Sequence, residues 1–548
     1  MSGSVRPRRT RHECGATSPQ HVGDDGPQNF SHTTPFMKDQ RLWQLTRLQS
    51  VWARLCVVCV VSLLLLWVFL GRHESHPPWT TFPPMTVDSL AQELGHPTFP
   101  DIRFYERNLP QHVVPSLLSK GKDRPRYLFL PQETWGSGWN NILQEQLLNT
   151  HLAYLSQRSY VFPDYIARDH PPLPDTLANG VRHWLHIPIN AFMSGPTAGG
   201  PLSSSGQDDL MRRSVSHEWW SIVCPPMEVV VVNLQDTMRE LELDDVSDGA
   251  DIMARWAAKL LDMAAPCVSI VSSDSGKAVF DYKFIGSKRV LSIWPSYGNS
   301  PALKNFAWSP LITAALFRNF HLLSSDPPPQ FLTPTGGRPY RFRSFPPYNP
   351  SAEPIKGLLG IHLRRGDFER HCARLAKDGL DYNAWNQLGT PGLSTRPASQ
   401  GSSPPDYVWP AIPDYLDVPE GQSRKDAAFA HCWPSAESIL ARVNSVRESA
   451  ASGVSFPPQN LHKIFMATNG SPSWIDNLTA HLQADGWEVS TSFEMDLTLE
   501  EHVVAQAVDM SVLTGAESFI GAGFSSMSSN VVQIRLAGGR DPGTIHFW

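Results

Sequence analysis

Residues 360–368 read Gly-Ile-His-Leu-Arg-Arg-Gly-Asp-Phe. The first of them close an apolar run that predicts a buried β-strand. Beyond that run the chain places Arg364 and Arg365 in succession, with His362 before them and Asp367 after them. In open α/β sheets, ligands bind at the carboxyl ends of the strands. Two guanidinium groups at such a point indicate a phosphate or carboxylate ligand, because their planar shape matches those groups bidentately.

Two other interpretations of this stretch compete with a binding site. It can be a surface charge cluster in which Arg365 and Asp367 form a local ion pair, and Arg365-Gly366-Asp367 also spells an adhesion tripeptide. An apolar strand that leads directly into Arg-Arg-Gly is not typical of a solvated face. An adhesion signal needs a protruding mobile loop, whereas this tripeptide follows a core strand. We therefore favour an anion-binding strand end.

A second stretch of the same half, residues 521–530, reads Gly-Ala-Gly-Phe-Ser-Ser-Met-Ser-Ser-Asn. Here a predicted strand stops, a Gly/Ser turn follows and a helix begins. Small residues let the backbone approach an anion, and serine hydroxyls with helical N–H groups bind phosphate. A plain serine N-cap is the simpler interpretation and is common. Together with the double-arginine strand end, however, this stretch favours a bound diphosphate. The candidate binding residues are Phe524, Ser525, Ser526 and Ser528.

The rest of this half alternates predicted strands and helices. Strands are expected at 463–468, 487–490 and 518–521, and helices at 472–485 and 500–513. Such alternation predicts a doubly wound parallel sheet. Residues 385–413 are rich in Pro, Ser and Gly and are expected to form a flexible insertion. The Pro-rich residues 324–350 are expected to link this half to the one before it.

The first half contains a predicted βαβ unit. Its strands are expected at 126–130 and 159–162 and its helix at 143–155, after a turn-rich loop at 136–141. Backbone N–H groups at a helix start form a ready anion site, and Gly138, Asn140 and Asn141 are the candidate residues there. Many such turns carry Gly and Asn only as turn chemistry. Further strands are expected at 227–232 and 289–294, and further helices at 251–264 and 308–322.

The beginning of the chain predicts a membrane anchor. Residues 55–70 are uncharged and apolar, slightly fewer than the ~20 residues that a typical bilayer needs. Lys38, Arg41, Arg47 and Arg54 precede them, which by the positive-inside rule places the N-terminus in the cytosol. A cleavable signal peptide is the alternative, but 54 residues precede the apolar stretch and no small-x-small cleavage site follows it closely. We expect a single-pass type II protein of the Golgi or endoplasmic reticulum, since short spans suit the thinner membranes of the early secretory pathway.

Cysteine usage agrees with a luminal location, because disulfides form in that oxidising compartment. Four cysteines lie in the luminal part, and four allow three pairings. We favour Cys224–Cys267 and Cys372–Cys432, because each pair flanks one contiguous segment. The same part carries two sequons as candidate glycosylation sites, at Asn469, where Pro472 weakens the signal, and at Asn477.

Charge and spacing exclude several classes of function. The net charge of −6 gives no electrostatic case for a nucleic-acid partner. The chain has no G-x-x-x-x-G-K-[ST] loop, which argues against a P-loop kinase. It also has no Asp-x-Asp pair of the kind that holds a metal on a nucleotide-sugar diphosphate, and Glu494-Met495-Asp496 is the nearest approach. We therefore expect cationic side chains to take the place of a metal ion.

Three patches resemble the GDP-fucose protein O-fucosyltransferases, a branch of the GDP-fucose fucosyltransferase superfamily. Residues 138–141 resemble the early G-F-x-N loop of the family. Residues 362–368 closely resemble its H-L-R-R-x-D-F motif. Asp509, with residues 519–521 and 524–528, resembles its C-terminal Asp and S-S-F-S signature. The order and wide spacing of the patches also match.

The resemblance implies a GT-B fold, an α/β architecture in which two Rossmann-like domains face each other across a cleft. It implies GDP-fucose as the donor substrate, inversion at the anomeric carbon, and no metal or other cofactor. The expected parts are a disordered cytosolic tail (1–54), a transmembrane anchor (55–71), a stem (72–100), an N-terminal Rossmann-like domain on the acceptor side (101–340) and a C-terminal Rossmann-like domain that binds the GDP-sugar (341–548).

The resemblance also implies roles for individual residues. Arg364 would hold the β-phosphate and stabilise the departing GDP, and charge that develops on a leaving diphosphate does need fixed cations. Asn141 would help to position the donor or the acceptor. The other residues expected to bind the substrate are Gly138, Asn140, His362, Arg365, Asp367, Asp509, Phe524, Ser525, Ser526 and Ser528.

The chain departs from the family pattern near the first loop. Some members place a glutamate that serves as the base directly before the glycine of that loop, but this chain has Ser137 there. Glu133 lies nearby and is the candidate base; otherwise the leaving phosphate takes the proton itself. Ile142 stands where Gln often follows the loop, and Met527 replaces the usual Phe of the C-terminal signature.

Two alternatives to a fucosyltransferase remain open at this point. One is a catalytically inactive luminal protein that binds a GDP-sugar or a glycan and has lost the base. The other is a transferase that uses a different GDP-sugar, such as GDP-mannose. The sequence leaves the acceptor open between protein and glycan.

Overall fold

A computed structural model describes most of the chain from residue 97 onward. Within 97–548 it leaves out 113–123, 132–137, 168–176, 179–180, 183–184, 204–208, 275, 335–344, 367, 391–406 and 453–458. The predicted cytosolic tail and membrane anchor therefore lie outside the described residues, as do Glu133 and Asp367. None of the helices in the described part of the chain has the length and apolar character needed to cross a bilayer.

The second half of the described chain is built on a parallel sheet whose central strand is β10. The sheet has the order β12-β11-β10-β13-β14, and every neighbouring pair is parallel. Its strands are β10 (Ile355–Leu363), β11 (Lys463–Thr468), β12 (Glu488–Thr491), β13 (Ala516–Gly521) and β14 (Ile545–Phe547). The register of β10 shifts between Ile355 and Leu359, where Gly357 adopts a φ of 73° that L-residues rarely accept.

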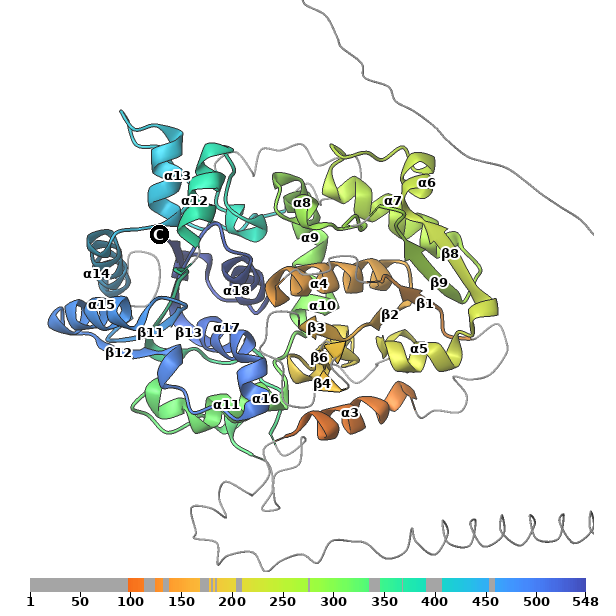
Figure 1. The fold of residues 1–548 in the computed structure, drawn as a ribbon, viewed down its shortest axis with the longest axis horizontal. Coiled ribbons are helices and arrows are strands. Elements are labelled where there is room, and N and C mark those ends of the chain that lie inside the picture. Colours follow the sequence, from red (N-terminus) through yellow and green to blue (C-terminus); the bar gives the residue numbers. More distant parts are fainter. Residues whose placement is uncertain are drawn as a thin grey trace, which may run out of the picture. The chain divides into compact units, whose positions relative to one another are not determined.

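Helices cover both faces of this sheet because the side chains of β10 alternate between the two faces. Leu359, Ile361 and Leu363 pack with α14 (Ala436–Ser452) and α15 (Pro472–Ala484). Leu358 belongs to the core on the other face, which includes side chains from α17 (Ala505–Gly515) and α18 (Ser526–Ala537). Figure 1 shows α14 and α15 on one side of the sheet and α17 and α18 on the other. The remaining helices of this half are α12 (Phe368–Lys377), α13 (Arg424–Cys432) and α16 (Leu499–Val503).

The first half contains a second parallel sheet, in the order β7-β2-β1-β9-β8. Its strands are β1 (Tyr127–Phe129), β2 (Ser159–Phe162), β7 (Val215–Ser216), β8 (Val229–Asn233) and β9 (Cys267–Val271). The helices beside it are α3 (Phe99–Arg107), α4 (Trp139–Leu155), α5 (His217–Val223), α6 (Leu234–Glu240) and α7 (Gly249–Asp262). Two short antiparallel pairs, β3 (Tyr165–Ala167) with β6 (Leu185–Ile187) and β4 (Leu177–Ala178) with β5 (Val181–Arg182), complete its strands. The described chain is thus an α/β protein with two parallel sheets, as the alternation of the sequence predicts.

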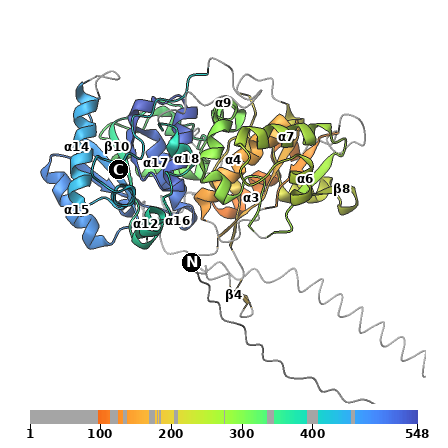
Figure 2. The ribbon, with the colours of Figure 1, turned by 90° about the horizontal axis from the view of Figure 1, so that it is seen from above.

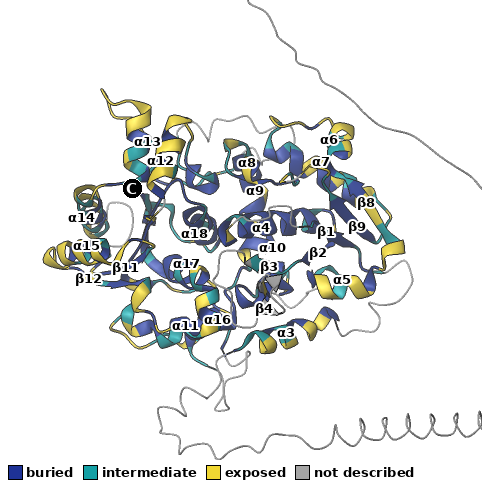
Figure 3. Cartoon of the chain, in the orientation of Figure 1, coloured by how far each residue is buried: buried dark blue, intermediate teal, exposed yellow. Residues whose placement is uncertain are grey.

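Helix α4 joins the two halves along α18, and both views place the two helices side by side (Figure 1 and Figure 2). Nearly every residue of α4 is buried, as its dark colour in Figure 3 shows. Gln144 Nε2 donates to Ser529 Oγ at 2.8 Å, and Asn530 Nδ2 donates to the Asn140 carbonyl oxygen at 2.8 Å. The resulting seam between α4 and α18 is polar and fully paired at these atoms.

Several predicted elements differ from the structure. The strand expected at 289–294 is wrong, since Lys288–Ile293 is a 3₁₀ helix that runs into α9 (Trp294–Tyr297). A short apolar run does not distinguish a strand from a buried helix, and here Ser287 caps the helix by accepting from Arg289 N. The flexible insertion expected at 385–413 is wrong at its start, where the 3₁₀ turn Ala384–Gln387 is buried. The helix expected at 500–513 is two helices, α16 and α17, that meet at Val504.

The structure contains both of the favoured disulfides. Cys224, just after α5, is bonded to Cys267 at the start of β9, with their Cα atoms 5.8 Å apart. Cys372 in α12 is bonded to Cys432 at the end of α13, with their Cα atoms 5.6 Å apart. The second bond ties α12, which follows the end of the central strand in the sequence, to α13.

Candidate functional site

A cavity of about 560 Å³ lies where β10 ends. Residues that are far apart in the sequence line it: Asn141, Tyr282, Arg364, Phe368, Arg370, His371, Arg374, Asn383, Phe524 and Ser526. Asn141 and Tyr282 come from α4 and from α8 (Tyr282–Ile285) of the first half, and the others come from the second half. We call this space the cationic cavity. It brings together four of the residues that the sequence predicts: Asn141, Arg364, Phe524 and Ser526.

Arg364 is the first residue after the buried central strand. Its guanidinium carbon lies 4.3 Å from the centre of the Phe368 ring, a distance typical of a cation–π contact. The side chain is exposed to the cavity. The turn that follows requires Gly366, which has a φ of 64° and would bring a Cβ atom within 3.2 Å of Asn469 Nδ2. The strand end therefore presents a guanidinium group to the cavity, as predicted.

The start of α18 forms the opposite wall. Ser525 caps the helix, since its Oγ accepts from Met527 N at 3.2 Å, and Ser526 lines the cavity. Phe524 is fixed by an edge contact to Tyr382, with ring centres 5.2 Å apart. Backbone N–H groups at a helix start carry partial positive charge and favour anions. Arg364 and this helix start thus offer two kinds of anion-binding group to one space.

Helix α12 contributes further positive charge that the sequence analysis missed. Arg370, His371 and Arg374 line the cavity from one helical face. Arg374 Nη2 donates to His371 Nδ1 at 3.0 Å, so this nitrogen of the imidazole carries no proton in that arrangement. No acidic side chain belongs to the described lining. The sequence could have predicted this, because Arg370, His371 and Arg374 follow the 362–368 motif at the i, i+1 and i+4 spacing of one helical face.

His362 does not line the cavity, but its hydrogen bond to Ser528 connects the end of β10 to α18. It is buried, and its Nδ1 lies 2.8 Å from Ser528 Oγ. Trp548 Nε1 donates to the His362 carbonyl oxygen at 2.7 Å. Burial, with a smaller effect of the Arg364 charge, lowers the pKa of His362 to about 3, so the imidazole is neutral at physiological pH. Ser528 also accepts from Ala522 N at 2.9 Å, and these contacts join the end of β10 to the turn before α18.

Arg365 does not face the cavity, which corrects its predicted role in substrate binding. Its guanidinium carbon lies 4.4 Å from the Trp433 ring centre and 4.5 Å from the Trp474 ring centre. Its Nη2 donates to the Pro434 carbonyl oxygen, and burial lowers its pKa to about 10. Its backbone N–H donates to Asn469 Oδ1 at 2.7 Å. Arg365 therefore holds the loop in place by packing.

Three other predicted residues, Asn140, Asp509 and Gly138, lie outside the lining of the cavity. Asn140 is buried in the seam, where its Nδ2 donates to Gln506 Oε1 at 2.9 Å and its carbonyl oxygen accepts from Asn530. Asp509 lies in α17, where burial raises the pKa of its carboxyl group to about 7 against a smaller opposing effect of a hydrogen bond to Ser492. Gly138 is the N-cap of α4, with open space where a Cβ would stand.

The two sequons differ in their surroundings. Asn469 is exposed, but its side chain already accepts a hydrogen bond from the Arg365 backbone. Asn477 is exposed on α15. Glycosylation at either position remains a prediction. In the described part of the chain, no group of three or more His, Cys, Asp or Glu side chains is arranged to hold a metal ion.

These features define an α/β protein of two parallel sheets, with a cavity lined by arginine side chains at the end of a central strand. No protein-family model matches the chain, and no curated protein matches it. Similar solved structures include POFUT1 in complex with GDP-fucose (TM-score 0.43, 14% identity, 78% of this chain and 99% of that one). They also include POFUT1 in complex with GDP, with a TM-score of 0.42, 14% identity and coverage of 77% of this chain and 97% of that one. The apo form of POFUT1 has a TM-score of 0.43 and 13% identity, with coverage of 78% of this chain and 99% of that one. Similarity at this level does not assign the chain to a family.

Proposed function

We propose that the protein is a glycosyltransferase that moves fucose from GDP-fucose to a protein or glycan acceptor, with inversion and without a metal ion. The observation that carries the proposal is that Arg364 and Ser526, from two separate motifs, line the same cavity. A guanidinium group and a helix start together match the charge and the oxygen geometry of a diphosphate. The resemblance of the motifs to the O-fucosyltransferases supports GDP-fucose as the donor.

The chemistry then follows from charge development. The acceptor hydroxyl oxygen attacks the anomeric carbon of the fucose from the face opposite GDP. As the new bond forms, the bond from that carbon to the β-phosphate oxygen breaks, and its electron pair leaves with GDP. Arg364 and the α18 amides are fixed where this negative charge grows, and such preorganised groups lower the barrier more than they stabilise the bound substrate. The hydroxyl proton passes to Glu133 or to the leaving phosphate.

Asn141 contributes from the other side of the cavity. It is half-buried in the first turn of α4, whose position is fixed by the hydrogen bonds of the seam. An amide on a rigid helix can donate to one hydroxyl and accept from another, which suits it to orient a sugar. We assign Asn141 to positioning the donor or the acceptor.

A second candidate function is supported by the composition of the cavity. The described lining has no carboxylate that could act as the base, and the Nδ1 of His371 already accepts from Arg374. A luminal protein that binds GDP-fucose without turnover, or a transferase specific for another GDP-sugar, would show the same cationic walls. The two disulfides suit the oxidising lumen of the secretory pathway, where we place the protein as a single-pass type II membrane protein.

The test measures binding and turnover in the same preparation. The full-length protein is titrated with GDP, UDP, GDP-fucose and GDP-mannose by thermal shift, and fucose release from GDP-fucose is then measured with and without acceptor panels. Arg364→Ala is the test variant and Arg239→Ala, an exposed arginine of α6, is the control. We expect stabilisation specific to GDP and GDP-fucose that only Arg364→Ala removes. Binding without turnover across the acceptors would favour the inactive binder, and equal activity of both variants would remove Arg364 from the mechanism.

A further inference from the structure

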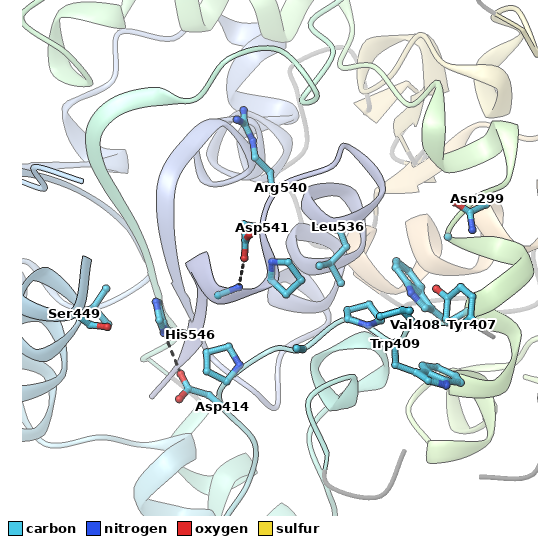
Figure 4. A pocket seen from close by; sticks show the side chains of 18 of the residues that line it. Asn299, Tyr407, Val408, Trp409, Asp414, Ser449, Leu536, Arg540, Asp541 and His546 are labelled. Atoms are coloured by element: carbon cyan, nitrogen blue, oxygen red, sulfur yellow. Dashed lines mark hydrogen bonds and ion pairs between the residues drawn. The ribbon is translucent and has the colours of Figure 1, made fainter. Parts of the chain in front are cut away.

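A second cavity, larger than the cationic cavity, lies at the opposite end of α18. Its volume is about 770 Å³, within the range typical of small-molecule sites. Leu536 of α18 lines it, whereas Ser526 at the other end of the helix lines the cationic cavity. Ten residues of α-helix span about 15 Å, so one sugar unit cannot occupy both. Figure 4 shows the residues around this space, with segment 407–414 crossing it.

Aromatic side chains form one part of this second cavity. Tyr407 and Trp409 stand at right angles, with ring centres 5.4 Å apart and an interplanar angle of 89°. The two lie together in Figure 4, beside the exposed Val408. Trp294 completes this wall and is held by Trp385, with ring centres 5.2 Å apart. Trp294 itself is buried, whereas the partly exposed Tyr407 and Trp409 can offer apolar ring surface to a ligand at little cost in conformational entropy.

The charged side chains of the second cavity are bonded within the protein. Lys304 Nζ donates to the Ala537 carbonyl oxygen at 3.0 Å, and Arg540 Nη2 donates to the Ala352 carbonyl oxygen at 2.6 Å. Arg442 forms an ion pair with Asp414. The carboxylate of Asp414 also faces His546, as Figure 4 shows, and accepts from the Phe547 N–H at 3.0 Å. Asp414 and Asp541 offset two of the three cationic side chains in the lining, and the hydrogen bonds named here already occupy donors of Lys304 and Arg540.

Uncharged polar side chains provide the remaining hydrogen-bonding groups. Ser445 and Ser449 lie one turn apart on α14, are exposed, and line the cavity. Asn299 lines it from the side of α9, with its Nδ2 directed to the Pro295 carbonyl oxygen at 3.3 Å. Hydroxyl and amide groups of this kind recognise hydroxyl groups of a ligand without requiring charge.

We propose that this second cavity binds a neutral oligosaccharide. Sugar rings present C–H faces to aromatic side chains and hydroxyl groups at their edges, which matches a cavity lined both by Tyr407 and Trp409 and by the polar Ser445 and Asn299. An anionic ligand is disfavoured, because the cations are already engaged. A lipid or an apolar peptide is disfavoured, because hydroxyl, amide and charged groups make up much of the lining. The site is separate from the cationic cavity, and the proposal does not depend on the function proposed above.

The experiment titrates the full-length protein calorimetrically with four neutral hexasaccharides: cellohexaose, laminarihexaose, mannohexaose and chitohexaose. A hexamer of galacturonate is the charged comparison. Trp409→Ala removes an aromatic face, and Ser445→Trp fills the cavity from an exposed helix position without removing any packing. Tyr415→Ala is the matched control, since Tyr415 directly follows segment 407–414, is exposed and does not line the cavity.

We expect at least one neutral hexamer to bind, with its Kd raised tenfold or more in Trp409→Ala and Ser445→Trp and unchanged in Tyr415→Ala. Arg364→Ala should bind the hexamer normally, and Trp409→Ala should bind GDP normally. Three results overturn the proposal: no neutral hexamer binds, only the galacturonate hexamer binds, or both test variants bind like the wild type. If Trp409→Ala does not fold, Ser445→Trp alone decides. If the wild-type protein binds a neutral hexamer but does not bind GDP, the proposed function is overturned and the oligosaccharide site is not.

Discussion

Arg364 and Arg365 are consecutive in the chain, yet their guanidinium groups lie in different environments. Arg364 packs on the Phe368 ring at 4.3 Å and lines the cationic cavity. Arg365 is enclosed between Trp433 and Trp474, at 4.4 and 4.5 Å from their ring centres. Successive side chains of an extended backbone point to opposite sides. We therefore expect Arg364 to contact the ligand, whereas Arg365 packs within the fold.

This division predicts opposite effects of two neighbouring substitutions. Arg364→Ala should weaken GDP binding by about 2–5 kcal/mol, the usual cost of truncating one partner of a buried charge pair, with little change in Tm. Arg365→Ala should lower the free energy of unfolding by about 2 kcal/mol, because it removes two cation–π contacts and leaves a space between the indoles. Titration of GDP and thermal unfolding of both variants measure the two effects. A stable Arg365→Ala protein that no longer binds GDP would contradict this assignment.

Asp509→Asn should stabilise the protein. Burial raises the pKa of Asp509 to about 7, so folding favours the protonated form. The cost of the charged form grows as the pH rises from the unfolded pKa of about 4 through 7. The gain in stability from Asp509→Asn should therefore be larger at pH 8 than at pH 5, by on the order of 1–2 kcal/mol. Thermal unfolding at both pH values tests this, and an equal gain at both would show that Asp509 does not titrate as described.

Acid should destabilise the protein through His362. Its pKa in the folded protein, about 3, lies below the ordinary value of 6.5. Between these two pH values the unfolded chain binds a proton at this histidine and the folded chain does not. The stability contributed by neutral His362 is thus complete above pH 6.5 and is lost as the pH falls toward 3. Between pH 6.5 and 4.5 this loss should reach about 2 kcal/mol. His362→Asn, which can still bond Ser528, should show a shallower decline in urea unfolding experiments over that interval.

The two disulfides should differ in their effect on the cavity. Removing either one by paired Ser substitution should cost about 2–5 kcal/mol of stability. Cys372–Cys432 holds α12, which carries two of the cationic side chains, Arg370 and Arg374, whereas Cys224–Cys267 joins the end of α5 to the sheet of the first half. Only Cys372→Ser with Cys432→Ser should therefore also raise the Kd for GDP. Equal nucleotide affinity of the two double variants at a temperature where both are folded would argue against a role of α12.

Chelation should leave nucleotide binding unchanged. If Arg364 and the α18 amides neutralise the diphosphate, the thermal shift caused by GDP should be the same with and without excess EDTA. Added Mg²⁺ or Mn²⁺ should not increase it. A shift that disappears with EDTA and returns with either ion would show that a metal ion takes part in binding.

The parts of the fold and site that are coded locally could be predicted from the sequence. The strand end at Arg364 and the helix start at Ser526 depend on apolar runs, glycines and serine caps within a few residues. The packing of Arg365 against two indole rings was missed because Trp433 and Trp474 are distant in the sequence. The alternation of side chains along an extended backbone does predict that Arg364 and Arg365 point to opposite sides. The cations of α12 were missed because that segment was not recognised as a helix.

Long-range packing also explains the wrong secondary structure. The apolar residues of 289–294 fit a strand pattern, but tertiary contacts of Val290, Leu291 and Ile293 select a helical turn. The Pro- and Ser-rich stretch after residue 384 has the composition of a loop. Trp385 nevertheless enters the core beside Tyr297, with ring centres 5.2 Å apart.

The polar seam between α4 and α18 has a consequence for turnover. Separating α4 from α18 would break the hydrogen bonds of Gln144, Ser529 and Asn530 across the seam. Each polar group left buried without a partner costs about 1–3 kcal/mol. We therefore expect α4 and α18 to stay together. If the protein transfers fucose as proposed, GDP should leave the cationic cavity without separation of the two sheets, so product release should not be limited by a hinge motion at the seam.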